Sequence, residues 1–153
     1  MIEGVVLKDL VVHADERGRL FEILRSDDKF FKKFGQTYIT VCYPGWVKGW
    51  HYHKIQTDYF CAVRGRAKIV MFDGRNGSKT CGLVEEYVLD AGKPQLLCIP
   101  NGIIHGFECE GSEECWIMNL PTELYKREKP DEYRLPLDSP EVPYKAWKNR
   151  KGF

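Results

Sequence analysis

The sequence predicts an all-β domain folded as a sandwich or a barrel, and two observations carry this prediction. Apolar and polar residues alternate with a period of two in short runs rich in Val, Ile, Tyr, Phe and Cys, which is the pattern of half-buried strands. Clusters of Gly, Pro, Asn and Asp separate these runs at short intervals, which favours local turns. A chain of 153 residues suits one domain, 1–153, because a second hydrophobic core would be poorly filled.

The expected strands follow one another along the first four-fifths of the chain. Turns are expected at 16–18, 73–79 and 100–102, since each carries Gly, Pro or Asn able to adopt the backbone angles of a turn. The strands themselves are expected at residues 5–12, 19–24, 36–43, 46–53, 58–64, 66–72, 83–89, 95–99, 106–110 and 114–119.

Two segments depart from this pattern. Three phenylalanines in residues 27–34 have helical spacing, so a short helix or turn there would place its rings against the barrel. After Asn119 the chain holds five of the eight prolines, and proline cannot lie in a central strand. We therefore expect this Pro-rich C-terminal tail to wrap the barrel without extending its sheet, with residues 148–153 frayed.

Composition excludes several classes of protein. Hydrophobic residues make up 43% of the chain, too many for a disordered protein. The formal charge of +1 and the absence of a basic stretch argue against a nucleic-acid partner. No apolar run approaches the ~20 residues of a membrane span, and no signal-peptide pattern opens the chain, so we expect a cytoplasmic protein. The six cysteines form no CxxC pair and are interpreted as reduced core thiols.

Three of the four histidines have a spacing that carries chemistry. His51 and His53 are two residues apart in one expected strand, so they point to the same face. Asp58 follows, and His105 stands in a later segment with Pro100 and Gly102. This two-part spacing resembles the cupin superfamily, which implies a jelly-roll (double-stranded β-helix) barrel with the histidines inside it. His13 lies outside this spacing and is interpreted as an ordinary strand residue.

Further motifs resemble the dTDP-4-dehydrorhamnose 3,5-epimerase family over nearly the whole chain. They occur in the family's order: DERGRLFE at residues 15–22, Gln36 with Tyr38 at a position where the family has Asn, KGWHY at 48–52, DGRNGSKT at 73–80, IPNGIIHGF at 99–107 and DSP at 138–140 followed by Trp147.

The resemblance implies chemistry on an NDP-4-keto-6-deoxyhexose without a cofactor. Its base corresponds to His51, held by Asp138, and its second pocket histidine to His105. The ketone acidifies the adjacent C–H groups, so a base can form an enolate that is reprotonated on the other face. The positions that hold the sugar and the diphosphate correspond to Arg17, Glu22, Gln36 and Lys48, and Tyr125 or Tyr43 would stack on the nucleotide base.

Three further positions differ from the family pattern. The enolate-stabilising Lys falls on Asp58, the Tyr acid on Met118, and His53 stands where the family has Gln. The first hypothesis is therefore an isomerase of altered scope: a single-centre epimerase, or a 3,4-ketoisomerase, with proton transfer by His51 or His53. Tyr38 or Tyr52 could replace the missing acid.

Two alternatives remain open from the residues. In the first, His51, His53, Asp58 and His105 bind a divalent metal such as Fe, Mn, Ni or Zn, because three imidazoles and a carboxylate suit these ions. In the second, the chain is a sugar-binding module that has lost catalysis. The family resemblance also implies a homodimer that exchanges N-terminal strands, which would cover exposed edges such as residues 5–12.

Overall fold

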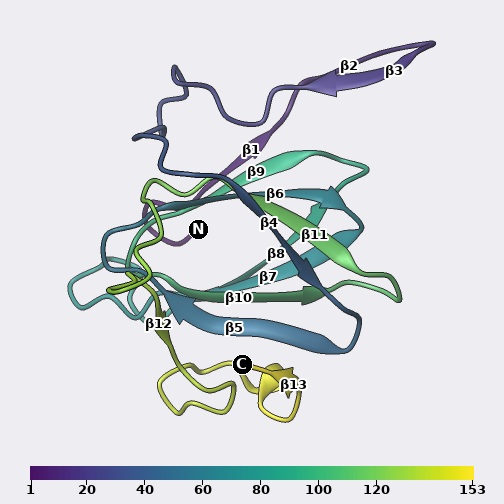
Figure 1. Ribbon diagram of the computed structural model, residues 1–153. Helices are drawn as coiled ribbons and strands as arrows, with labels where there is room; N and C mark the ends of the chain where they lie inside the picture. The colour runs from purple at the N-terminus through teal and green to yellow at the C-terminus, as the bar shows by residue number, and fades with distance from the viewer.

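The protein is nearly all β, as predicted, and its two main sheets lie face to face as in a cupin jelly roll (Figure 1). The computed structural model describes residues 1–153. Its strands are β1 (Val6–Asp9), β2 (Val12–Asp15), β3 (Gly18–Phe21), β4 (Tyr38–Cys42), β5 (Trp46–Tyr52), β6 (Asp58–Arg64), β7 (Arg66–Phe72), β8 (Val84–Asp90), β9 (Gln95–Ile99), β10 (Ile104–Cys109), β11 (Cys115–Asn119), β12 (Tyr133–Arg134) and β13 (Lys151–Gly152), with one short 3-10 helix at Lys145–Trp147.

The two sheets bring strands that are distant in sequence side by side. One has the order β1-β9-β6-β11-β4 and the other β12-β5-β10-β7-β8, with β13 added to β5. A cluster of 16 buried residues from both sheets, including Phe60, Ile69, Met71 and Phe107, fills the space between them. Alternation along each strand produces this core, since neighbouring side chains point to opposite faces of a sheet.

Loops and the tail cover the outer faces of both sheets. On the five-stranded sheet, Tyr59 and Leu96 pack with Leu10 and with Phe30 from the 27–34 segment. On the other sheet, Trp50 and Val70 pack with residues of the tail such as Trp147. The alternate residues of these strands are therefore buried as well, which explains the nearly continuous burial of β6 and β7.

The β5–β10 pair contains an irregularity that shapes the interior. His105 lies opposite His51, but Phe107 lies opposite Lys48, so β5 carries one extra residue over this interval. A bulge of this kind re-aims side chains, and here it allows both Lys48 and His51 to face the interior. Gly49 and Gly106 make this possible, because a Cβ built on Gly106 would come within 2.8 Å of the Gly49 Cα.

Several sequence predictions need correction. The 5–12 run is split, because the chain leaves the sheet after Asp9 and residues 12–21 form a separate β2–β3 hairpin that projects from the body (Figure 1). The tail covers the second sheet, as expected, but it also extends that sheet through β12 and β13. Residues 151–152 are therefore paired and not frayed. In the 27–34 segment the turn alternative holds, over residues 27–30, and Phe30 packs against the sheet as expected, but Phe34 is 60% exposed.

Two smaller findings concern the thiols and the helix content. All six cysteines are free, and five of them are buried as expected of core thiols, whereas Cys81 is exposed. No helix in the structure has the length and apolar character that a bilayer crossing requires.

Candidate active site

A pocket of about 550 Å³ opens between the two sheets. Six of the residues singled out in the sequence line it: Gln36, Tyr38, Lys48, His51, His53 and Tyr125. The lining is completed by polar and apolar side chains from the sheets and the tail: Thr40, Gln56, Phe60, Phe107, Leu124, Asp131, Glu132, Arg134 and Phe153.

Three histidines converge at the inner part of this pocket. The ring centroids of His51 and His105 are 4.2 Å apart, because the two residues are direct partners in the β5–β10 ladder. One nitrogen from each of His51, His53 and His105 lies within 4.8 Å of the others. The sequence prediction that these imidazoles meet inside the barrel is consistent with this geometry.

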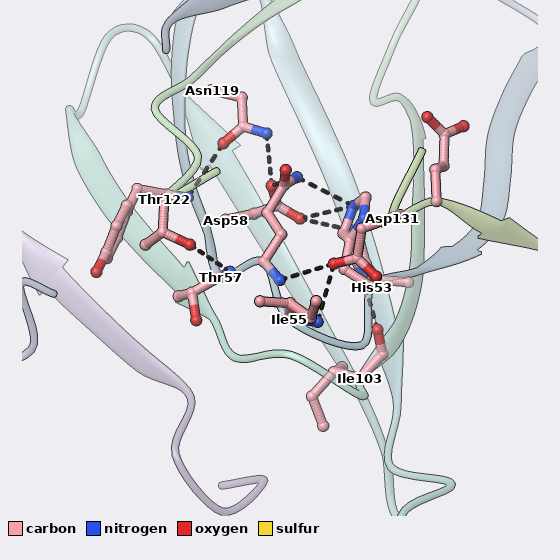
Figure 2. A network of polar contacts seen from close by, with 12 residues as sticks. His53, Ile55, Thr57, Asp58, Ile103, Asn119, Thr122 and Asp131 are labelled. Atoms are coloured by element: carbon pink, nitrogen blue, oxygen red, sulfur yellow. Dashed lines mark hydrogen bonds and ion pairs between the residues drawn. The ribbon is translucent and has the colours of Figure 1, made fainter. Parts of the chain in front are cut away.

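Backbone carbonyls orient two of the rings. The Nδ1 atom of His105 donates a hydrogen bond to the carbonyl of Ile103 at 2.9 Å, and Nδ1 of His53 donates to the carbonyl of Asp131. The Nε2 atoms therefore both point inward, toward Asp58 (Figure 2). The Nε2 atom of His105 has no hydrogen-bond partner although it is buried.

Asp58 is a fully buried carboxylate at the centre of the network in Figure 2. Its Oδ1 accepts hydrogen bonds from Gln56 Nε2 at 2.8 Å and from Asn119 Nδ2 at 2.7 Å. Its Oδ2 lies 3.2 Å from Nε2 of His53 and 3.5 Å from Nε2 of His105. Burial alone would raise the pKa of Asp58, but the interactions with the two histidines hold that pKa well below its ordinary value.

The pKa values of His53 and His51 are shifted in opposite directions, which gives the two histidines different roles. Burial opposes the charged form of His53, but the Asp58 carboxylate and the Asp131 carbonyl outweigh it and raise the pKa of His53 to about 8. Burial and the neighbouring His105 and His53 lower the pKa of His51 well below its ordinary value. His51 is thus a neutral imidazole able to accept a proton, beside an ionic His53–Asp58 pair.

The tail builds one wall of the site. The carboxylate of Asp131 accepts hydrogen bonds from the backbone N–H groups of Lys54, Ile55 and Gln56 at 2.8–3.0 Å. These bonds fix the loop that joins His53 to Asp58, and Figure 2 shows Asp131 beside Ile55 of this loop. The short tail strand β12 pairs with β5, where Arg134 lies opposite His51. The tail therefore contacts both the loop after His53, through Asp131, and the strand that carries His51.

Three predicted site residues lie elsewhere in this chain. Asp138 is exposed, does not line the pocket and has no hydrogen bond or ion pair with His51; the carboxylate beside the imidazoles is Asp58. Asp138 lies in a turn of the tail. Its neighbours Leu137 and Ser139 are buried, so the Asp138 side chain faces solvent. Arg17 lies on the projecting hairpin, in an ion pair with Asp15, and Glu22 follows the hairpin and pairs with Arg25.

Sequence reasoning missed Gln56, Asn119, Asp131, Arg134 and Phe153. Each is a single polar or aromatic residue at a strand end, in a loop or in the tail, where such residues usually serve turns or solvent. The sequence offered one related signal: His53 and Asp58 both depart from the family pattern. In the structure their side chains are in contact.

Comparison with known proteins agrees with the fold and with the predicted resemblance. The family model described as polysaccharide biosynthesis C-terminal domain matches residues 13–133. The spore coat polysaccharide biosynthesis protein SpsL of Bacillus subtilis is 38% identical over 138 residues, which are 90% of this chain and 91% of that protein. A protein of Haloferax volcanii named "Probable low-salt glycan biosynthesis epimerase" is 39% identical over 139 residues, 90% of this chain and 89% of its own.

Among solved structures, a dTDP sugar isomerase from Desulfovibrio desulfuricans G20 superposes with a TM-score of 0.88 at 29% identity, covering 97% of this chain and 93% of that one. The agreement in sequence and in fold thus extends over nearly the whole chain. This protein belongs to the polysaccharide biosynthesis C-terminal domain family and, within the cupin fold, to the RmlC-like sugar epimerases.

Proposed function

We propose that this protein epimerises a nucleoside-diphosphate 4-keto-6-deoxyhexose, with a dTDP-sugar as the first substrate to test. The observation that carries the proposal is the state of His51. Its imidazole is neutral, lines the pocket and makes no hydrogen bond to the protein, and its ring centroid lies 4.2 Å from that of His105. A base of this kind can remove a proton from carbon 3 or carbon 5, because both carbons flank the 4-ketone.

The pocket supports this chemistry at both ends. Inside, the His53–Asp58 pair presents an imidazolium whose positive charge can stabilise an enolate oxygen. Toward the opening, Lys48 and Arg134 supply cations for a diphosphate, and Tyr125 supplies an exposed ring for a nucleotide base. The uncharged sugar ring would therefore lie between the proton acceptor, His51, and the cations that bind the diphosphate, Lys48 and Arg134.

The test is incubation with dTDP-4-keto-6-deoxyglucose in heavy water. We expect deuterium at carbon 3 or carbon 5 and a new epimer, both detected by NMR, and His51→Asn should reduce exchange by at least about 100-fold. A carbonyl that moves to carbon 3 would instead identify a 3,4-ketoisomerase. Tight dTDP-sugar binding by the wild type with no exchange at either carbon would contradict the proposal and leave a sugar-binding module.

A second candidate, a metal-dependent isomerase, is favoured by Nε2 of His105, which is buried, makes no hydrogen bond and lies 3.5 Å from Asp58 Oδ2. Two histidines of the site donate Nδ1–H to backbone carbonyls, which is how metal-binding histidines are oriented. The nitrogens of the three imidazoles lie close enough together to share one ion, and imidazoles suit Fe, Mn, Ni or Zn. The Asp58 carboxylate lies beside this group, 3.2 Å from His53 and 3.5 Å from His105. Such an ion would supply a Lewis acid for the ketone oxygen.

Elemental analysis of protein purified without added metal separates the two candidates. A stoichiometric ion that is lost in His53→Ala, together with loss of activity in a chelator, would establish the metal-dependent enzyme. Metal-free protein with full activity would exclude it.

We further propose that the chain forms a homodimer through the β2–β3 hairpin. The hairpin projects from the body (Figure 1) and exposes Val12 and Leu20, while Val11 before it is 70% exposed. Apolar side chains on a projecting ribbon favour burial against a second copy. This arrangement would give Arg17, which is remote from the pocket of its own chain, a place in an interface.

A further inference from the structure

The hydroxyl of Tyr38, one of the two candidates for the missing acid, is a proton-bearing group in the pocket. Tyr38 begins β4, lines the pocket and lies opposite Asn119 in the β4–β11 ladder. Although the residue as a whole is 42% exposed, its hydroxyl oxygen reaches the buried amide of Asn119 and accepts a hydrogen bond from Nδ2 at 2.9 Å. The hydroxyl is therefore anchored at the inner end of the pocket.

The orientation of Asn119 leaves the proton of Tyr38 available. The Oδ1 atom of Asn119 accepts a hydrogen bond from the backbone N–H of Tyr59 at 3.1 Å, so its NH₂ group must face the interior. That NH₂ group donates both to Asp58 Oδ1, at 2.7 Å, and to the Tyr38 oxygen. A tyrosine hydroxyl carries one proton and can also accept. Since Tyr38 accepts from Asn119 and no protein group accepts its proton, that proton can be donated to a bound ligand.

Tyr38 and His51 stand on opposite walls. Tyr38 belongs to the five-stranded sheet and His51 to the six-stranded sheet, and both line the same pocket. Beside them, Lys48 Nζ donates to Thr40 Oγ1 at 2.9 Å and joins the two walls. Inversion at a carbon requires a proton to leave from one face and to arrive at the other, so groups on opposite walls have the required arrangement.

Several other groups near the pocket are less suited to deliver this proton, and His53 already directs its Nε2 toward Asp58. Met118 carries no proton to transfer. Tyr52 stacks on Tyr133, with ring centroids 5.2 Å apart, and does not line the pocket. Asp131 is held as a carboxylate by three backbone N–H groups, and Glu132 pairs with Arg134.

We propose that Tyr38 is the catalytic acid that delivers a proton to the enolate carbon on the face opposite His51; this inference rests on the proposed epimerase function. His51 takes the proton of the substrate C–H bond, and the electron pair of that bond forms the enolate. The Tyr38 O–H bond then breaks, its proton forms the new C–H bond, and a phenolate remains. The phenolate regains a proton from water and His51 releases one, so the cycle needs no other reactant.

The surroundings of Tyr38 suit an acid that is protonated at rest. Burial and the nearby Asp58 carboxylate raise the pKa of Tyr38 to about 12, while the hydrogen bond from Asn119 opposes the increase. The same Asn119 N–H group stabilises the phenolate after proton transfer. Tyr38 thus holds its proton until an enolate, a strong carbon base, forms next to it.

The experiment compares Tyr38→Phe with a matched control, Tyr52→Phe, in heavy water with dTDP-4-keto-6-deoxyglucose. For Tyr38→Phe we expect deuterium to enter the recovered substrate with unchanged configuration, because His51 still removes and returns a proton on its own face. Epimer formation should decrease by about 100-fold or more. Tyr52→Phe should exchange and epimerise like the wild type, and calorimetric titration with dTDP should give equal binding for both variants.

The outcomes distinguish this inference from the proposed function. If Tyr38→Phe forms the epimer within about twofold of the wild-type rate, Tyr38 is not the acid and the epimerase function stands. If Tyr38→Phe loses exchange and epimer formation together, its role is structural and the inference is again overturned. A wild-type protein that neither exchanges nor epimerises would refute the proposed function and this inference with it.

Discussion

Asp58 shows how two substitutions relative to a family pattern can be one chemical change. A carboxylate where the related enzymes carry a lysine looks unfavourable for an enolate when it is considered alone. In the structure the carboxylate faces His53, another departure, at 3.2 Å, and raises the pKa of that imidazole to about 8. The site therefore keeps a cationic group, an imidazolium in place of an ammonium, but pairs it with a carboxylate, so that the two together carry no net charge.

Asp73 leads to a prediction about stability and pH. The DGRNGSKT motif folds around its buried carboxylate, which accepts hydrogen bonds from Arg75, Ser78 and Thr80 at 2.7–2.9 Å. These bonds, with Arg75 contributing most, lower the pKa of Asp73. A lowered folded-state pKa stabilises the protein above the unfolded value of about 3.9, and this stability is lost as the pH falls below that value toward the folded-state pKa.

We expect Asp73→Asn to lower the free energy of unfolding at pH 7 by roughly 2 kcal/mol, since hydrogen bonds to a charged group are lost. The difference from the wild type should shrink below pH 4, as urea titrations at several pH values would show. Asp27→Asn, which alters an exposed ion pair with Arg25, is the control and should stay close to the wild type. A constant difference between pH 7 and pH 2 would contradict the assigned role of the Asp73 charge.

At the scale of elements, the contact between β5 and β10 aligns the site. A Cβ on Gly106 would meet the Gly49 Cα and the Lys48 carbonyl oxygen at 2.8 Å. Gly106→Ala must therefore push the two strands apart, and we expect it to destabilise the fold by about 1–3 kcal/mol. Because His51 and His105 are partners in this ladder, exchange activity should fall more than the folded fraction does.

Gly74→Ala is the control for this variant, since its Cβ would meet side-chain atoms of Phe72 and Ile104 at 3.3–3.4 Å and no backbone. Thermal unfolding and deuterium exchange measured on both variants test the prediction. A Gly106→Ala protein that matches Gly74→Ala in stability and exchange would show that the close approach of the strands is dispensable.

The accuracy of the strand predictions follows the length of the apolar pattern. Strands β6, β7 and β9 have the predicted bounds, because alternation or continuous burial runs through them and ends at polar or Gly residues. The break between β1 and β2 was missed because both pieces are apolar enough to read as one strand. Strands β12 and β13 are two residues long, too short to have any periodicity.

At the scale of the whole molecule, the hairpin predicts an oligomer. We expect sedimentation equilibrium to report twice the chain mass of 17.8 kDa, and Leu20→Asp to shift the protein to monomer, since a charge would then be buried in the interface. Phe34→Asp, at an exposed aromatic residue outside the hairpin, is the control and should remain dimeric. A wild-type protein that sediments as a monomer at all concentrations would refute the dimer.

The histidines could be predicted as a group and their environment could not. Spacing places His51 and His53 on one face of an expected strand, and the resemblance to the cupins implied that His105 joins them. The fold brings the three together. The groups that orient the rings of His53 and His105 are the backbone carbonyls of Asp131 and Ile103, which belong to the tail and to a loop. Which loop carbonyl meets which imidazole depends on the packing of the whole chain, and no local pattern records it.

The bond between His53 and the Asp131 carbonyl, 78 positions further along the chain, restricts how this enzyme can be engineered. A minimal module cut after the jelly-roll strands would keep all three imidazoles but would lose the backbone group that fixes one of them. Fusion partners, affinity handles or loop grafts are therefore best attached at the β10–β11 connection, leaving the segment from Thr122 to Arg134 intact. We expect proteolytic nicking of that segment to inactivate the protein by releasing Asp131 and β12, while strands β1 to β11 stay folded.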